Sequence, residues 1–350
     1  MNPDSSLISR SAAETVGLVP YLLGFHPHDS LVVVGFIGRR VMFGARYDLP
    51  PPGFHDLDTV TTLILRQRVQ AVFVLGYGPP GRVTPAVLAL ATALRRVGLP
   101  VLDVVRVTEG RWWSYMCGNP SCCPPEGNAC RPEVSPAVAN AVYQGRVALP
   151  SRAALAARVA PVEGTLRVEM TEATERARTR LAGADDPPGR RMLRAGHRAV
   201  REAERRAQDG RPLTADEAAW LGVLLTDVRV FDYALERKTG DDWWIQLWID
   251  VLRHVEPRYV PAPACLVGYV AWRVGDGPLA RVAIDRALLA DPSDETAIGL
   301  DQLLNSGLGP HALTSHRPPG RPMGPTGPGR QRGGTGGGRR VRRGTHRRSS

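Results

Sequence analysis

The stretch AVFVLGYGPPGRVTPAVLALATALRRVGLPVLDVVRV (71–107) decides the fold class of this chain. Its first seven residues, 71–77, are almost all apolar and predict a strand that is buried on both faces. An Ala- and Leu-rich helix is expected over 84–97, and a second strand over 101–107. A strand, a helix and a strand in this order favour a right-handed parallel crossover, so the stretch predicts an α/β layer.

Elements on both sides of this stretch add to the layer. Two β-rich runs, 31–37 and 41–49, are joined by Gly38-Arg39-Arg40 and predict a hairpin. A helix is expected over 60–69. Thr108-Glu109-Gly110 can turn the chain back after the second strand of the crossover, which makes 111–116 the partner strand of another hairpin.

A helix is expected ahead of the first hairpin. Ser11 and Glu14 have the spacing of a capping box, and Gly24 can end the helix after 12–23. Residues 1–134 are therefore predicted to form an α/β domain whose mixed sheet combines hairpins with a parallel crossover.

The second half of the chain reads as helical. Strand signals vanish from residue 135 onward, and 135–306 are predicted to form an all-α domain. The helices are expected at 135–144, 151–159, 163–182, 190–209, 215–237, 242–254, 262–274, 278–290 and 295–305. The region 262–304 has the spacing of a tetratricopeptide-like helical pair. Residues 307–350 are rich in Gly, Pro and Arg and are expected to be a disordered basic tail.

The positive charge of the chain is concentrated in that tail. The net charge is +11, but ten of the 45 basic residues are arginines at 317–350, where there is no Asp or Glu. The other 316 residues carry 35 basic and 34 acidic groups. Nucleic-acid binding is therefore expected only as a weak, salt-sensitive contact of the tail.

The sequence indicates a cytoplasmic protein. The longest strongly apolar run is far shorter than the roughly 20 residues that a membrane-spanning helix needs, and the N-terminus has no pattern of an export signal. The five cysteines are therefore expected to remain reduced thiols or to bind a metal.

Three of these cysteines, Cys117, Cys122 and Cys123, follow each other closely. Inert packing, metal binding and a reactive thiol are all open readings. Zinc is a possible cofactor, but C-x4-C-C-x6-C is not the usual spacing, and the vicinal pair is expected to point its side chains apart. A metal would then need His26, His28, Glu126 or water to complete its shell.

The residues before the cysteines form a second candidate. If 111–117 is a strand, Arg111, Trp113, Tyr115 and Cys117 share one face. Such a face can bind an anion or a planar ligand through charge and stacking. The alternative is an edge strand whose aromatic residues cover the core.

Two loops complete the candidate ligand-binding residues. His26 and Asp29 lie just before the first strand and carry acid–base or ligand groups, although turn chemistry explains them equally well. Gly76 and Gly78 lie at the carboxyl end of a central strand, where open α/β sheets bind ligands. The same glycines also suit an ordinary strand-to-helix turn.

Other residues are interpreted as core. The three tryptophans at 243, 244 and 248 fall at helical spacing, which favours packing against a neighbouring helix. Cys265, in an apolar helix, is also expected in the core.

Several blocks together carry a resemblance to a known family. They are PYLLGFHPHDSLVVVG (20–35), VLGYGPP (74–80), RWWSYMCGNPSCCPPEG (111–127), LTDVRVFDYAL (225–235) and AWRVGDGPLARVAIDRALLADP (271–292). In order and wording they resemble the actinobacterial domain-of-unknown-function family 4192 over residues 7 to 305. The resemblance implies no activity and no catalytic residues, and Cys130 departs from the family pattern.

Three functions remain open from the sequence. The favoured one is a scaffold that binds a ligand on its α/β half and a protein partner through its helical half. The second is a metal- or thiol-dependent enzyme that uses Cys117, Cys122 and Cys123. The third is non-specific nucleic-acid binding through the basic tail.

Overall fold

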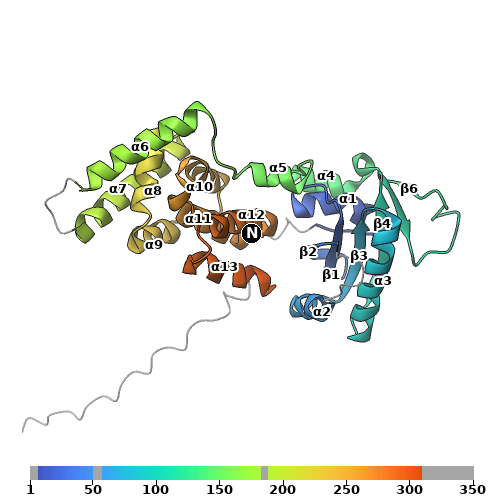
Figure 1. Ribbon diagram of the computed structural model, residues 1–350. Coiled ribbons are helices and arrows are strands. Elements are labelled where there is room, and N and C mark those ends of the chain that lie inside the picture. The colour runs from blue at the N-terminus through green and yellow to red at the C-terminus, as the bar shows by residue number, and fades with distance from the viewer. Residues whose placement is uncertain (1–6, 50–56, 183–187, 310–350) are drawn as a thin grey trace, which may run out of the picture.

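The computed structural model describes residues 7–49, 57–182 and 188–309. A sheet with its covering helices lies at one end of the molecule, and the helices from residue 165 onward form a body at the other (Figure 1). The helix over 136–143 stays at the sheet end, where it packs on the helix over 12–23. The expected basic tail lies outside the described residues from position 310 onward.

Six strands form one mixed sheet in the order β2-β1-β3-β4-β5-β6. They are β1 (Ser30–Ile37), β2 (Arg40–Asp48), β3 (Ala71–Tyr77), β4 (Val101–Thr108), β5 (Arg111–Ser114) and β6 (Asn128–Ala129). β3 and β4 are parallel, whereas the other neighbours are antiparallel. The predicted combination of hairpins and a parallel crossover is therefore confirmed.

The two central strands, β1 and β3, are buried on both faces. Val33 and Val74 pack into a cluster with helices α2 (Leu57–Arg66) and α3 (Pro80–Arg96). Val34 and Leu75 point to the opposite face, where they share a cluster with α1 (Ala12–Leu23). Helices must cover both faces because apolar side chains project from both.

Turns and caps explain where these elements begin and end. Ser11 Oγ accepts the N–H of Glu14, and Gly24 ends α1 in the left-handed conformation with φ 72°. The β4–β5 turn uses positive φ angles at Glu109 (50°) and Gly110 (73°), as a tight hairpin requires. α3 begins four residues before the predicted start, because Pro80 is tolerated in the first turn of a helix.

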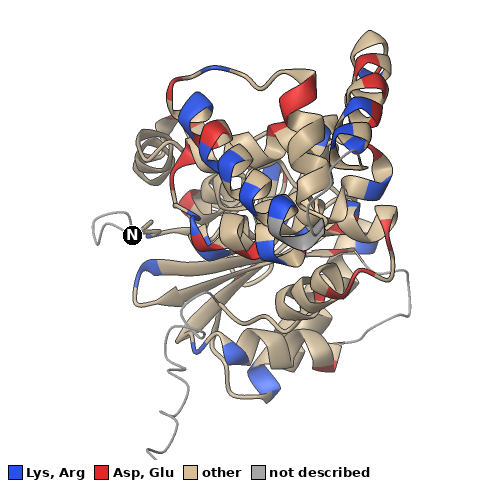
Figure 2. Ribbon diagram, turned by 90° about the vertical axis from the view of Figure 1, so that its left-hand side faces the viewer, with Lys and Arg blue, Asp and Glu red and all other residues tan. Residues whose placement is uncertain are grey.

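The second half of the described chain contains no strand from residue 136 to residue 309. Its α-helices are α4 (Pro136–Tyr143), α5 (Arg152–Ala157), α6 (Thr165–Ala182), α7 (Pro188–Gln208), α8 (Ala215–Leu224), α9 (Val228–Glu236), α10 (Asp242–His254), α11 (Pro261–Val274), α12 (Gly277–Ala290) and α13 (Glu295–Asn305). Figure 2 shows that both basic and acidic residues occur on the helices of this half.

One predicted helix, 215–237, is wrong because it is two helices. Asp227 is the N-cap of α9, and its carboxylate accepts the backbone N–H of Arg229. The Thr226 hydroxyl donates to the carbonyl of Val223 at the end of α8. These local side-chain bonds compete with the helical backbone pattern, so the chain breaks between α8 and α9.

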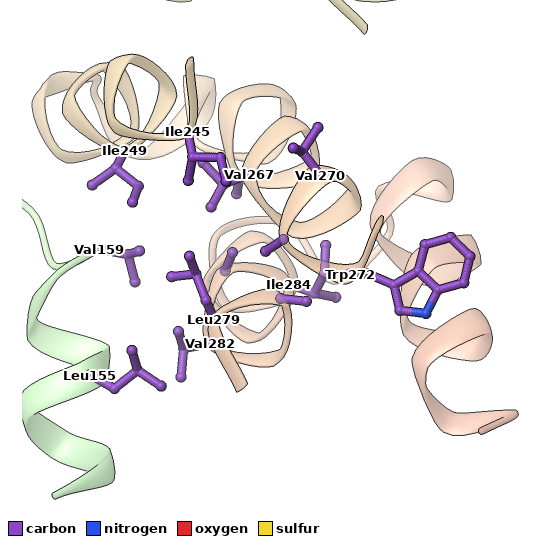
Figure 3. Close-up of a cluster of buried hydrophobic side chains, with 14 of the residues drawn as sticks. Leu155, Val159, Ile245, Ile249, Val267, Val270, Trp272, Leu279, Val282 and Ile284 are labelled. Atoms are coloured by element: carbon purple, nitrogen blue, oxygen red, sulfur yellow. The ribbon is translucent and has the colours of Figure 1, made fainter. Parts of the chain in front are cut away.

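The core of the helical half is formed by α10, α11 and α12. Trp244 and Trp248 are fully buried there, and Cys265 is also fully buried, as expected. Leu155 and Val159 lie against α12 close to Leu279 and Val282 (Figure 3). The same buried cluster continues into the residues of α1 and the sheet. α11 and α12 form the expected helical pair, and its likeness to a tetratricopeptide repeat stays a prediction.

A second contact joins the sheet-bearing half to the end of the described chain. The guanidinium of Arg66, at the end of α2, donates to the carbonyl of Ser306 at 3.1 Å. Trp272 Nε1 donates to the carbonyl of Leu308 at 3.1 Å. The segment after α13 is therefore held between α2 and α11, as the neighbouring positions of α2 and α13 in Figure 1 indicate.

Within the described residues, none of the helices has both the length and the apolar character needed to cross a membrane.

Gly76 tests the packing of α3 on the sheet. A Cβ at Gly76 would lie 2.3 Å from Val83 and 2.7 Å from Val87. We expect Gly76→Ala to lower the free energy of unfolding by about 1–3 kcal/mol, because the core is overpacked. Gly81→Ala in α3, where a Cβ meets nothing within 4 Å, should instead stabilise by about 0.5 kcal/mol. Urea unfolding of both variants measures the difference, and equal stability of Gly76→Ala and the parent would contradict the packing.

Candidate metal and thiol site

The site begins where strand β5 ends at Ser114. The Ser114 hydroxyl oxygen accepts the backbone N–H groups of Met116 (3.0 Å) and Cys117 (3.1 Å), and the hydroxyl donates to Asp103 at 2.6 Å. These bonds turn the chain out of the sheet. The predicted strand to residue 116 is therefore two residues too long, and Cys117 lies in the loop instead of on the strand face.

A tight turn then returns the chain to Cys117. The carbonyl of Asn119 accepts the N–H groups of Cys122 (3.2 Å) and Cys123 (2.8 Å), and its side chain accepts the N–H of Ser121 at 2.9 Å. Asn128 donates from its side chain to the carbonyl of Cys122 at 3.0 Å. The turn has its backbone groups paired, so its shape is set by local hydrogen bonds.

This turn gathers the three sulfur atoms. Cys117 Sγ lies 2.9 Å from Cys122 Sγ, and Cys122 Sγ lies 3.9 Å from Cys123 Sγ. All three lie within 4.8 Å of one another. The expectation that the vicinal pair points its side chains apart is therefore wrong, because the turn at Asn119 directs both sulfurs toward Cys117.

The three thiols differ in acidity. Hydrogen bonds from the thiol of Cys122, the backbone N–H of Asn119 and the thiol of Cys123 lower the pKa of Cys117. The hydrogen bond to Cys117 raises the pKa of Cys122. Burial raises the pKa of Cys123 to about 12, with further increases from both neighbouring thiols. Cys117 is therefore the first of the three to form a thiolate.

The aromatic and basic residues of β5 hold the loop that follows the cysteines. Arg111 Nη1 donates to the carbonyls of Glu126 (3.2 Å) and Gly127 (2.8 Å), and Trp113 Nε1 donates to that of Pro125 at 2.9 Å. The guanidinium of Arg106 stacks on the Trp113 ring, 3.8 Å from its centroid. Arg111 and Trp113, which the sequence suggested as groups for binding a ligand, therefore bind other parts of the chain instead.

Trp112 and Tyr115 lie on opposite faces of the sheet, as alternation predicts. Trp112 packs in the cluster with α1, whereas Tyr115 packs in the cluster with α3. The hydroxyl of Tyr115 is 2.5 Å from that of Thr84. The alternative reading of 111–116 as an edge strand is wrong in one respect, because β6 pairs with β5 on its outer side. Its aromatic residues Trp112 and Tyr115 do cover the core, as that reading expected.

The other candidate residues lie apart from the cysteines. Asp29 lies beside Gly78, where a Cβ would be 2.9 Å from its carboxylate oxygen. The carboxylate forms an ion pair with Arg82 (3.3 Å) and lies 3.6 Å from Nδ1 of His28. His26 is exposed. Gly76 faces Val83 of α3, so the space over this glycine is filled by the protein.

The cysteines alone form a candidate metal group. Among the described residues, Cys117, Cys122 and Cys123 are the one group of three or more His, Cys, Asp or Glu ligands with atoms this close. His26, His28 and Glu126 are not part of it. A metal held here would keep at least one coordination position for water or another donor.

Sequence reasoning missed five residues that shape the site, the first of which is Ser114. Asp103 and Arg106 are charged residues within the otherwise apolar strand 101–107. These two charges were the signal in the sequence that could have pointed to them. Asn119 and Asn128 are typical loop residues, and only the folded turn shows which backbone groups they bind.

The geometry defines an α/β and helical protein with a trithiol loop at one edge of its sheet. Residues 13–311 match the model of a family described as a domain of unknown function, DUF4192, so the chain belongs to that family. We found no match to the chain among curated proteins or among solved structures.

The pKa differences predict an order of alkylation in the reduced, metal-free protein. At neutral pH, Cys117 should react first with iodoacetamide and Cys123 last of the three, because the thiolate is the nucleophile. The buried Cys265, whose pKa burial raises to about 12, should react only after unfolding. Mass spectrometry of peptides after timed quenching measures the order, and equal rates at Cys117 and Cys123 would contradict it.

Proposed function

We propose that this protein is a zinc-binding scaffold in which the thiolates of Cys117, Cys122 and Cys123 bind one Zn²⁺. The observation that supports the proposal is the gathering of three sulfur atoms within 4.8 Å of one another. Thiolates are soft ligands that zinc prefers, and free sulfurs at an exposed edge do not need to gather for packing.

The distances suit a zinc ion after a small adjustment. A tetrahedral ion with Zn–S bonds of about 2.3 Å holds its sulfurs about 3.8 Å apart. The separation of 3.9 Å between Cys122 and Cys123 already fits. Cys117 and Cys122, at 2.9 Å, would move apart by about 0.9 Å, which a side-chain rotation in an exposed loop can supply.

Protons compete with zinc at this site. A thiol must lose its proton to bind the metal, and the pKa of Cys123 is about 12 in the metal-free state. Zinc binding is therefore expected to release protons and to weaken as the pH falls. The remaining coordination position would hold water or a donor atom of a ligand.

The metal would fasten the loop to the sheet edge. Arg111 and Trp113 hold the segment from Pro125 to Gly127 on one side of the loop, and the ion would hold its start on the other. The scaffold would present a ligand site at the open coordination position, and the helical half is the proposed surface for a protein partner.

Zinc titration of the reduced protein tests the proposal. We expect one Zn²⁺ per chain, with protons released on binding and a Tm that rises with zinc concentration, because the ion binds only the folded loop. Cys122→Ser removes a direct ligand of the metal. Zinc affinity should therefore fall by more than the roughly 10- to 100-fold that follows the loss of an outer-shell partner.

Cys130→Ser is the matched control. Cys130 is half-buried and lies outside the sulfur cluster, so this variant should keep full stoichiometry and affinity. Equal zinc affinity in the parent, Cys122→Ser and Cys130→Ser would refute the proposed site.

Disulfide exchange is a second candidate, favoured by the 2.9 Å between Cys117 and Cys122. The Cys117 thiolate would attack an external disulfide, forming a mixed disulfide and releasing one thiolate. Cys122 would lose its proton and attack Cys117 Sγ, releasing the second thiolate. Two protein thiols are then oxidised to one disulfide while the external disulfide is reduced to two thiols.

Cys123→Ser separates the two candidates. Zinc binding uses all three sulfurs, so the variant should lose tight zinc binding, whereas a Cys117–Cys122 disulfide does not use Cys123. Equilibration with glutathione redox buffers, followed by mass spectrometry, measures the disulfide. If the variant retains full zinc affinity, the three-thiolate site is wrong, and if the parent forms no such disulfide, the exchange reaction is wrong.

A further inference from the structure

Three arginines of the helical half lie close together: Arg167 of α6, Arg253 of α10 and Arg286 of α12. Arg253, in the last turn of α10, donates from Nε to the carbonyl of Ala160 at 3.3 Å, and its own carbonyl accepts the N–H of Val162 at 2.9 Å. Arg167, in the first turn of α6, donates to the carbonyl of Val255 at 3.1 Å. The segment before α6 therefore lies along the end of α10.

Arg286 reaches the same place from α12. Val282 lies close to Val159 in the shared core (Figure 3). Arg286 is four residues after Val282 in α12, so it lies one helical turn further along the same face of the helix. The charges of Arg167 and Arg253 both act on the Arg286 guanidinium, which places the three side chains close together.

The described carboxylates do not pair with this cluster. Among the described residues, the ion pairs do not include Arg167, Arg253 or Arg286. Moreover, Nη1 of Arg286 is buried and has no hydrogen-bond partner in the part of the chain that the structure describes. A buried, unpaired donor on a cation is costly, so an arginine held in this way indicates a missing acceptor.

Another arginine of α12 shows the contrast. Arg281 pairs with Asp285 at 2.8 Å and with Asp301 at 2.6 Å. Asp285, the neighbour of Arg286 in sequence, also pairs with Arg152 at 2.9 Å. The acidic groups near this part of α12 are thus engaged elsewhere, and Arg286 is left facing two other cations.

The electrostatics of Arg286 agree with this geometry. Burial, followed by the charges of Arg167 and Arg253, lowers the pKa of Arg286 to about 10. The guanidinium still carries its proton at neutral pH. Three positive charges therefore remain close together, and a bound anion would relieve their repulsion.

We propose that Arg167, Arg253 and Arg286 form an anion site that binds the phosphate group of a small-molecule ligand. Guanidinium groups present planar N–H forks that match phosphate oxygens, and a dianion answers several cations at once. The arginines come from three helices and are each only partly exposed, which suits a compact terminal group better than an extended polymer. Arg167 also lies in the first turn of α6, where the helix dipole favours an anion.

Thermal unfolding with added anions tests the site in the full chain. The probes are inorganic phosphate and glycerol 3-phosphate, each compared with sodium chloride at equal ionic strength. The parent Tm should rise with phosphate or with the ester beyond its value in chloride, because binding to the folded state stabilises it. If the Tm rises only with glycerol 3-phosphate, the ligand is a phosphate ester. If the Tm rises with both probes, the site recognises the phosphate group whether it is free or esterified.

Arg286→Met should keep or raise the Tm measured without phosphate and should reduce the rise in Tm that phosphate causes. Without phosphate the variant should be at least as stable as the parent, since a buried repulsive charge is removed. Its response to phosphate should fall, with at least about tenfold weaker binding by isothermal titration calorimetry. Arg273→Met, which removes an exposed arginine at the end of α11, should respond like the parent. The arginines at 317–350 are present in every variant and cancel in the comparison.

Arg167→Gln provides a second variant, because glutamine keeps a side-chain N–H for the carbonyl of Val255. It should also weaken phosphate binding at least about tenfold. If Arg286→Met and Arg167→Gln bind phosphate as the parent does, or if the parent Tm responds to phosphate no more than to chloride, there is no such site. If Arg286→Met lowers the Tm equally with and without phosphate, Arg286 has a structural role and the proposal is overturned.

Discussion

Burial of the central strands β1 and β3 on both faces is the constraint on which the rest of the structure depends. Their apolar side chains project to both sides of the sheet, so neither face can be left to water. α2 and α3 cover one face. α1 covers the other, and the buried cluster it belongs to continues into the helical half. The apolar faces of the sheet therefore determine where the helices lie, and the polar groups of the cysteine loop lie at the β5–β6 side of the sheet.

That edge is where the thiols gather. β5 has four residues, and Ser114 ends it by binding two backbone N–H groups that the sheet no longer pairs. A loop outside the sheet can bring sulfurs together in a way that a strand cannot, because alternate residues of a strand point to opposite faces. The loop is shaped from within by Asn119 and held from outside by Arg111 and Trp113.

The two candidate sites differ in the charge of the side chains that form them. Most arginines of the helical body have a carboxylate or carbonyl partner, as Arg281 does with Asp285 and Asp301. Arg286 differs because its buried Nη1 has no such partner among the residues that the structure describes. At the sheet edge the groups are neutral thiols with unequal acidity, and Cys117 forms its thiolate most readily. The helical junction therefore suits an anion, and the sheet edge suits a soft cation.

The sequence by itself determined the elements that depend on local patterns. The apolar run at 71–77, the capping residue Ser11 and the change to helical periodicity after 135 predicted the mixed sheet, α1 and the helical half. Such signals act over a few residues, so they can be read along the chain. The break at Asp227 was missed because its side chain competes with helix formation only through a local bond that periodicity does not reveal.

The tertiary structure alone decided what the candidate residues do. The spacing of Cys117, Cys122 and Cys123 suggested diverging sulfurs, yet the turn at Asn119 brings them together. The sequence around Arg286 shows nothing unusual. Its charged neighbours, Arg167 and Arg253, come from two other helices, and its buried Nη1 has no hydrogen-bond partner among the described residues. Hydrogen bonds and charges act over distances in space, and distance in space is set only when the chain has folded.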